Sequence, residues 1–159
     1  LRSSGIIALQ RILKGGGLPE GTVVQSWRGT EGAIEGSKLG YDVILSPNQF
    51  VYFDYPQVPN TSKPKWMRIT PLEKVYSFDL ALPELDPEQL QHILGAECTM
   101  WTEHAPQDEV DRQLFPRVCA FTEIVWTDPE KKTWDDFTER LSVHKARLRK
   151  LGVDFFEDE

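Results

Sequence analysis

Short apolar runs alternate with helical stretches along this chain, and three of the runs lead into an aromatic residue. The runs and the aromatic segments that follow them are residues 22–26 with Trp27, residues 42–46 with Tyr52-Phe53-Asp54, and residues 92–100 with Trp101-Thr102-Glu103. A fourth run, residues 5–9, reads as a short buried strand. Runs of this kind with helices between them predict parallel strands. Because such folds bind ligands at the carboxyl ends of their strands, the pattern predicts a pocket there.

Capping residues predict three helices between and after the strands. Thr30 is expected to cap a short helix that stops at Gly40. The sequence Asp86-Pro87-Glu88-Gln89 has the residues of a helix start, with Asp as N-cap and Pro at the first helical position. Thr133 is expected to cap the last helix, whose acidic start and basic end complement the helix dipole before Gly152 stops it.

Apolar spacing adds to this picture. A helix after Glu103 is predicted from the near-helical spacing of Val110, Leu114, Val118, Phe121 and Val125. The last helix is expected to present one apolar stripe: Trp134, Phe137, Leu141, Leu148 and Leu151. From residue 55 to residue 83 the chain is rich in proline and shows no sustained period, so we expect a long loop that is functional or covers something.

These elements predict a single α/β domain over residues 1–159, with about four parallel strands and flanking helices. Eight such strand-helix units close a (β/α)8 barrel, typically in about 250 residues. The pattern alone therefore leaves two architectures open, a small open α/β sheet or half of a barrel.

Composition excludes several classes of function. A net charge of −7 argues against a nucleic-acid surface, which needs clustered Lys and Arg. No apolar stretch is long enough to span a bilayer. Three scattered histidines and two cysteines, expected to be unpaired, show no metal-ligand spacing, so we expect neither a metal nor another cofactor.

Two pairs of residues are the strongest candidates for chemistry. If Trp101 and Glu103 continue a strand, their i, i+2 spacing puts both side chains on one face. Trp could then stack on a pyranose ring while Glu accepts hydrogen bonds from its hydroxyl groups. Tyr52 and Asp54 have the same spacing. The alternatives are a core Trp with a solvated acid in the first case and an exposed aromatic loop in the second.

The other tryptophans carry weaker signals. Trp27 precedes Arg28-Gly29, which fits a sharp turn after a strand, and a lone Trp there is more often packing than pocket. Trp66 is a lid aromatic or an anchor for its Pro-rich loop. Trp126 and Trp134 are expected to lie in the core of the terminal helices.

Six blocks of the sequence together resemble the glycoside hydrolase family 20 β-N-acetylhexosaminidases in order and spacing. The blocks cover most of the chain, and they are residues 12–16, 23–29 with 40–47, 52–56, 71–76, 94–103 and 115–123. Each block is a weak signal by itself, and the signals become specific when they are read together: among them are Tyr52-Phe53-Asp54-Tyr55-Pro56, the segment Leu94-Gly95-Ala96-Glu97-Cys98-Thr99-Met100-Trp101-Thr102-Glu103, and the segment Phe115-Pro116-Arg117-Val118-Cys119-Ala120-Phe121-Thr122-Glu123.

The resemblance implies a fold, a reaction and a set of site residues. Family members are (β/α)8 barrels that remove terminal N-acetylglucosamine or N-acetylgalactosamine with retention, using the acetamide of the substrate as nucleophile. By similarity, Tyr52 would donate its hydroxyl to the acetamide oxygen, and Trp27 and Trp101 would line the pocket. Glu103 would hold the O4 and O6 hydroxyls of the sugar, and Asp54 would contribute to binding in the same pocket. Family members are typically secreted, periplasmic or lysosomal, but no feature of the chain indicates a compartment.

The resemblance is limited to the second half of the family barrel, roughly strands five to eight. No segment of these residues resembles the part that carries the catalytic Asp-Glu pair, so we expect binding of N-acetylhexosamine glycans with little or no activity. Leu9, Gln10 and Arg11 stand where the family usually has Trp-Asp-Glu, which weakens the pocket. The alternative is a non-catalytic module in which two half-barrels form a homodimer, because a half-barrel exposes sheet edges and an apolar face.

Overall fold

The computed structural model describes residues 18–19, 21–60 and 62–157. By their contacts the residues form two compact units. We call Leu1–Asn48 with Leu80–Glu97 the sheet unit, and Gln49–Asp79 with Cys98–Glu159 the helical unit. The prediction of one domain stays a prediction, and each unit is described by itself.

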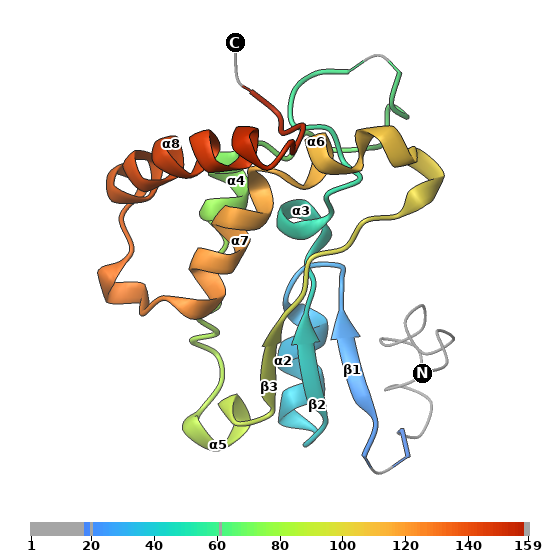
Figure 1. Cartoon of the computed structure of the whole chain (residues 1–159). Helices are drawn as coiled ribbons and strands as arrows, with labels where there is room; N and C mark the ends of the chain where they lie inside the picture. Colours follow the sequence, from blue (N-terminus) through green and yellow to red (C-terminus); the bar gives the residue numbers. More distant parts are fainter. Residues whose placement is uncertain (1–17, 20, 61, 158–159) are drawn as a thin grey trace. The chain divides into compact units, whose positions relative to one another are not determined.

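The sheet unit contains three parallel strands in the order β1-β2-β3 (Figure 1). The strands are β1 (Val23–Ser26), β2 (Asp42–Leu45) and β3 (Ile93–Ala96). Val24 pairs with Val43, and Leu45 pairs with Ala96 after a register shift in the β2-β3 pair. Three of the four predicted strands are therefore present, while the one predicted over residues 5–9 lies outside the described residues.

One helix covers one face of this sheet. Helix α2 (Glu31–Lys38) brings Gly36 so close to β1 and β2 that a Cβ there would lie 3.3 Å from Val43 and 3.7 Å from Val24. Val24 and Val43 are almost completely buried. The apolar strand residues on this face thus form the core of the sheet unit, and α2 supplies the other side of it.

The predicted helix starts of the sheet unit differ in outcome. Asp86 caps α5 (Pro87–Leu90) by accepting from the Gln89 backbone N–H, and Gln89 Oε1 accepts from the Asp86 N–H, so the predicted cap is confirmed as a capping box. Thr30 does precede α2, but its side chain makes no capping hydrogen bond. Its φ of −106° and ψ of −11° already lie near the helical region, whereas a capping side chain needs an extended backbone.

The prediction of one long strand over residues 92–100 is wrong beyond Ala96. The following backbone makes only an isolated parallel bridge, between Tyr52 and Thr99. Trp101 then precedes a single 3-10 turn over Thr102–His104. The register shift in the β2-β3 pair leaves out Leu94, and the ladder continues from Gly95, with a φ of +138°, to Ala96.

The helical unit consists mainly of helices. They are α3 (Asn48–Val51), whose first residue belongs to the sheet unit, α4 (Leu72–Tyr76), α6 (Val110–Leu114), α7 (Arg117–Trp126) and α8 (Trp134–Lys150), with 3-10 turns over Gln107–Glu109 and Pro129–Lys131 (Figure 1). Helix α4 interrupts the segment predicted as an unbroken loop from residue 55 to residue 83. The single helix predicted after Glu103 is two helices, because Pro116 has no backbone N–H to continue α6.

The core of the helical unit is aromatic. The Phe53 and Phe121 rings meet edge to face at 6.5 Å, and Tyr76 stacks on Phe137 at 4.7 Å. Thr133 caps α8 by accepting from the Asp136 N–H, as predicted. Phe137, Leu141 and Leu148 are buried, as the apolar stripe predicted.

Two parts of the predicted core are wrong. Leu151 is 76 % exposed, and Trp126 is 85 % exposed instead of buried. Both residues stand at the carboxyl end of their helix, where the neighbouring turn covers less of the side chain. Trp134 is partly exposed and packs its ring against Tyr76 and Phe137.

No helix in the described part of the chain is long and apolar enough to cross a membrane. Cys98 and Cys119 form no disulfide.

Candidate functional site

Tyr52 and Asp54 lie in a short turn that is held against the segment after β3. The Thr99 N–H donates to the Val51 carbonyl at 2.9 Å, and the Phe53 N–H donates to the Thr99 carbonyl at 2.8 Å. The Tyr55 N–H donates to the Tyr52 carbonyl at 3.3 Å, which closes the turn. Tyr52 and Asp54 therefore do not lie on a regular strand, and the strand alternation that predicted a shared face does not apply to them. Both are nevertheless held beside residues 99–101.

Asp54 is a buried carboxylate with unused hydrogen-bonding capacity. The backbone N–H groups of Asp54 itself and of Trp101 lie near its carboxylate, whose Oδ1 atom has no hydrogen-bond partner among the described residues. The residue is only 2 % exposed. Burial raises the pKa of Asp54 above its ordinary value, and the two backbone N–H groups, Arg117 and His104 oppose that rise. A buried acceptor without a donor is costly, and a ligand hydroxyl group would satisfy it.

Arg117 lies beneath this turn and is completely buried. Its guanidinium donates to the carbonyls of Phe53 and Tyr55, the two neighbours of Asp54 in the sequence. The Phe53 ring lies 4.8 Å below the guanidinium carbon. Loss of hydration lowers the pKa of Arg117 to about 9, so the group stays charged at neutral pH. Arg117 lies in residues 115–123, one of the segments that resemble the family, but the sequence alone indicated no role for it.

A series of ring contacts links Tyr52 with the turn that carries Glu103. The Tyr52 and Tyr55 rings lie 5.6 Å apart, Tyr55 meets Trp66 at 6.0 Å, and Trp66 meets His104 at 5.8 Å. Trp66 is thus packed against Tyr55 and His104 even though 63 % of it is exposed. The Lys63 ammonium donates to the His104 carbonyl, which ties the Pro-rich loop to the same turn.

Trp101 and Glu103 lie on this turn and are exposed. Trp101 is 48 % exposed, so about half of its surface remains available to a ligand. Because Glu103 belongs to a 3-10 turn, the strand alternation that predicted a shared face does not apply to this pair. The backbone N–H of Trp101 nevertheless lies near the Asp54 carboxylate.

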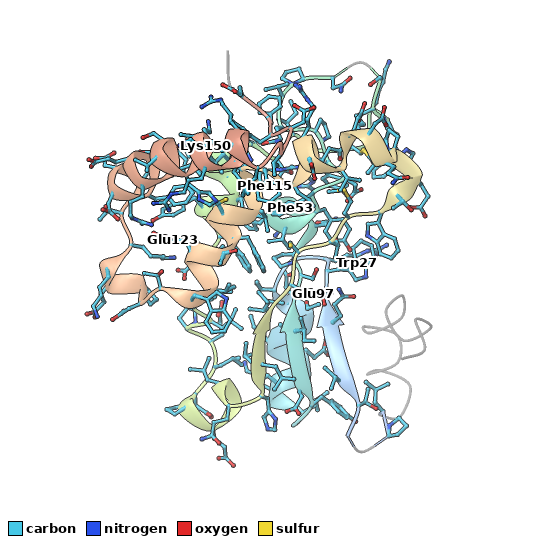
Figure 2. The ribbon with its side chains drawn as sticks, in the orientation of Figure 1. Trp27, Phe53, Glu97, Phe115, Glu123 and Lys150 are labelled. Atoms are coloured by element: carbon cyan, nitrogen blue, oxygen red, sulfur yellow. The ribbon has the colours of Figure 1, made fainter. Side chains whose placement is uncertain are left out.

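The sheet unit carries Trp27 and an acid that sequence reasoning did not single out. Trp27 and Glu97 both follow the carboxyl ends of their strands (Figure 2), and the Arg28 guanidinium lies 4.4 Å over the Trp27 ring. The Glu97 N–H donates to the Leu45 carbonyl, and burial raises the pKa of Glu97 above its ordinary value. The Oγ of Ser46, the residue after β2, is buried without a partner. The pairing of Leu45 with Ala96 puts Ser46 and Glu97 at adjacent positions, so sheet register was the signal that could have found this acid.

Two further points limit the site. In the part of the chain that the structure describes, no three His, Cys, Asp or Glu groups lie together in a way that could hold a metal ion. Leu9, Gln10 and Arg11, the positions where the sequence departs from the family, lie outside the described residues.

Comparison with known proteins shows the family of the chain. Residues 2–129 match the sequence profile of glycosyl hydrolase family 20, catalytic domain. The chain belongs to this family. The β-hexosaminidase of Porphyromonas gingivalis is 35 % identical over 153 residues, which are 94 % of this chain and 20 % of that protein. The β-hexosaminidase of Vibrio furnissii is 38 % identical over 104 residues, which are 62 % of this chain and 17 % of that protein.

Solved structures of family 20 enzymes have the same fold over most of the chain. The exo-β-N-acetylglucosaminidase of Vibrio harveyi, solved in complex with N-acetylglucosamine, superposes with a TM-score of 0.82 at 31 % identity. The superposition covers 91 % of this chain and 23 % of that enzyme. A mutant β-hexosaminidase of Streptomyces plicatus with N-acetylglucosamine as product gives a TM-score of 0.78 at 27 % identity, over 92 % of this chain and 31 % of that one. The family 20 chain therefore spans about a fifth to a third of the relatives it matches.

Proposed function

We propose that this family 20 chain binds the terminal N-acetylhexosamine of a glycan and that it hydrolyses the glycosidic bond weakly or not at all by itself. The helical unit supplies Tyr52, Asp54, Trp101 and Glu103 for this binding. Trp27, which belongs to the sheet unit, is proposed to bind the sugar by resemblance to the family alone. Weak hydrolysis is proposed because none of these residues resembles the Asp-Glu pair of the family, and loss of a general acid alone costs typically about 10²–10⁴-fold in rate.

The observation that carries the proposal is the buried Asp54 carboxylate, whose Oδ1 has no hydrogen-bond donor. Next to it stands a tryptophan with about half of its surface uncovered, followed two residues later by an exposed carboxylate. An apolar ring face beside acceptors for hydroxyl groups suits one face of a pyranose and its equatorial hydroxyls. By resemblance, Tyr52 holds the acetamide oxygen in line with the anomeric carbon.

Titration of the purified chain with N-acetylglucosamine, followed by heat and by Trp fluorescence, tests this function. Glu103→Gln keeps the shape of the side chain and removes its charge, and we expect it to weaken binding about ten-fold or more, because hydrogen bonds to charged groups are the strong ones. Glu139→Gln on α8, also an exposed acid, is the matched control and should bind like the wild type. Absence of any saturable signal from the wild-type chain would contradict the proposed binding.

Hydrolysis of a chromogenic N-acetylglucosaminide tests the second part of the proposal. We expect release of the chromophore close to the uncatalysed rate. Robust turnover that Glu103→Gln abolishes would show instead that the carboxylates of this chain are sufficient for catalysis.

A second candidate function is that of a homodimeric assembly module. In the described part of the sheet unit, β1 and β3 each have a strand on one side only, and Val23 and Leu94 are 50 % and 57 % exposed. Such edges and apolar residues favour pairing with another copy. Light scattering at micromolar concentration should then give twice the mass of 18.3 kDa, and a monomer would contradict the dimer.

A further inference from the structure

The guanidinium of Arg117 uses all of its hydrogen-bonding capacity on the backbone around the proposed sugar site. Its Nη1 donates to the carbonyls of Tyr55 at 2.9 Å and Thr70 at 3.0 Å. Its Nη2 donates to Phe53 and to Gln113, each at 2.6 Å, and its Nε donates to Gln113 at 3.1 Å. An arginine has five N–H donors in a rigid fork, and all five are used here.

This position is an unfavourable one for a cation. Arg117 is the first residue of α7, where the helix dipole disfavours positive charge, and no acid stands in the first helical turn to offset it. Removing a guanidinium from water is costly in addition, which agrees with its lowered pKa. An apolar residue here would avoid these costs but would leave four backbone carbonyls without their donor, so the hydrogen bonds of Arg117 are the reason for an arginine at this position.

The hydrogen bonds of Arg117 hold the backbone on both sides of Asp54. The Phe53 and Tyr55 carbonyls stand on either side of that residue, and one planar group holds both. With the backbone fixed on both sides, the direction of the Asp54 side chain is restricted. Lysine could not replace this contact, because an ammonium group has no rigid fork that reaches two carbonyls at defined angles.

Arg117 is also one of the few charged groups that act on Asp54. His104 on the 3-10 turn also acts on this carboxylate. Cys98 is the further titratable group that acts on Arg117. The positive charge of Arg117 opposes the effect of burial on Asp54 and favours the ionised carboxylate, which is the better acceptor for a sugar hydroxyl.

We propose that Arg117 is the positioning residue of the sugar site: its guanidinium fixes the Phe53–Tyr55 backbone so that the Asp54 carboxylate points at the ligand. The role rests on the proposed function, because it presupposes that Asp54 binds sugar. Arg117 itself does not touch the ligand. It acts through five hydrogen bonds and one charge.

Two variants separate its geometric contribution from its electrostatic one. Arg117→Met keeps the volume but removes both the fork and the charge, whereas Arg117→Lys keeps the charge only. Leu148→Ala in the core of α8 is the stability control, because it removes buried apolar contacts without touching the Asp54 turn. Affinity for N-acetylglucosamine is measured against pH for each protein, at a temperature where unfolding curves show it to be folded.

We expect Arg117→Met to weaken binding at pH 7 by about ten-fold or more, the size expected for misplacing a charged hydrogen-bond acceptor. Binding by this variant should fall away on acidification at a higher pH than in the wild type, because Asp54 takes up a proton more readily without the nearby charge. Arg117→Lys should bind weakly too, but with the wild-type pH profile. Leu148→Ala should change neither the affinity at pH 7 nor the pH profile of binding. Wild-type affinity in folded Arg117→Lys, or equal losses in Arg117→Met and Leu148→Ala, would overturn the proposal.

A measurement without ligand keeps the inference testable if the chain binds no sugar. Carboxyl carbon NMR follows the titration of Asp54 directly, and its pKa should be higher in Arg117→Met than in the wild type and Leu148→Ala. An unchanged Asp54 pKa would refute the electrostatic role of Arg117. A wild type that binds no N-acetylglucosamine while the Asp54 pKa shifts as expected would refute the proposed function alone.

Discussion

Trp101 offers the sharpest test of the proposed sugar site, because the size of the effect follows from its exposure. Trp101 is 48 % exposed. A Trp side chain offers at most about 250 Å² for burial, so roughly 120 Å² remains open, of which a stacked pyranose covers about half. At about 25 cal/mol per Å², that contact contributes about 1.5 kcal/mol. Trp101→Ala should therefore weaken binding of N-acetylglucosamine about ten-fold.

The assay is a calorimetric titration of folded wild-type and variant chains, with the folded state checked by circular dichroism. Trp126→Ala is the matched control, because Trp126 at the end of α7 is 85 % exposed and has no part in the proposed site. We expect Trp126→Ala to bind like the wild type and to unfold at nearly the same temperature. Equal affinities of the two variants, or a loss that is larger in Trp126→Ala, would refute the stacking role of Trp101.

Three further predictions concern stability. Burial holds the pKa of Asp54 above its unfolded value of about 3.9, so the folded state binds the extra proton and stability falls as pH rises through that window. Asp54→Asn should remove this fall. If the melting temperatures of variant and wild type change with pH in the same way between pH 4 and pH 7, the prediction is contradicted. Phe137→Ala should cost about 3–5 kcal/mol in urea unfolding, because Phe137 is buried and stacks on Tyr76, and a cost below about 1 kcal/mol would be inconsistent with that core. Asp86→Ala should cost about 1 kcal/mol through loss of the capping box, and an unchanged urea midpoint would show that the cap contributes nothing.

Local patterns succeeded where the physical cause is local. The capping box at Asp86 and the cap at Thr133 each depend on a side chain that reaches a backbone N–H three residues away. The buried stripe of α8 follows from the helical repeat, since Phe137, Leu141 and Leu148 lie on one face. Thr30 shows the limit of this reasoning, because a suitable side chain caps nothing when the backbone before the helix is not extended.

Strand ends were harder to predict, because pairing decides where a strand stops. The apolar run was expected to continue to Met100, yet the ladder of β3 ends at Ala96, two pairs after the register shift. Trp101 and Glu103 consequently belong to a turn, and no spacing rule predicts that the Trp101 backbone lies near the Asp54 carboxylate. Trp126 has the composition of a core residue but lies at a helix end that its unit leaves uncovered.

By itself, the sequence determined the family, the α/β class and the residue types of the candidate site, because these depend on order and spacing along one chain. Only the tertiary structure decided that Asp54 is a buried acceptor without a donor for its Oδ1, and that Arg117 holds the backbone on both sides of it. Arg117 is 62 and 64 residues away from its partners Tyr55 and Phe53. The physical reason is that burial and hydrogen bonding act through space, and residues so far apart meet only when the chain has folded.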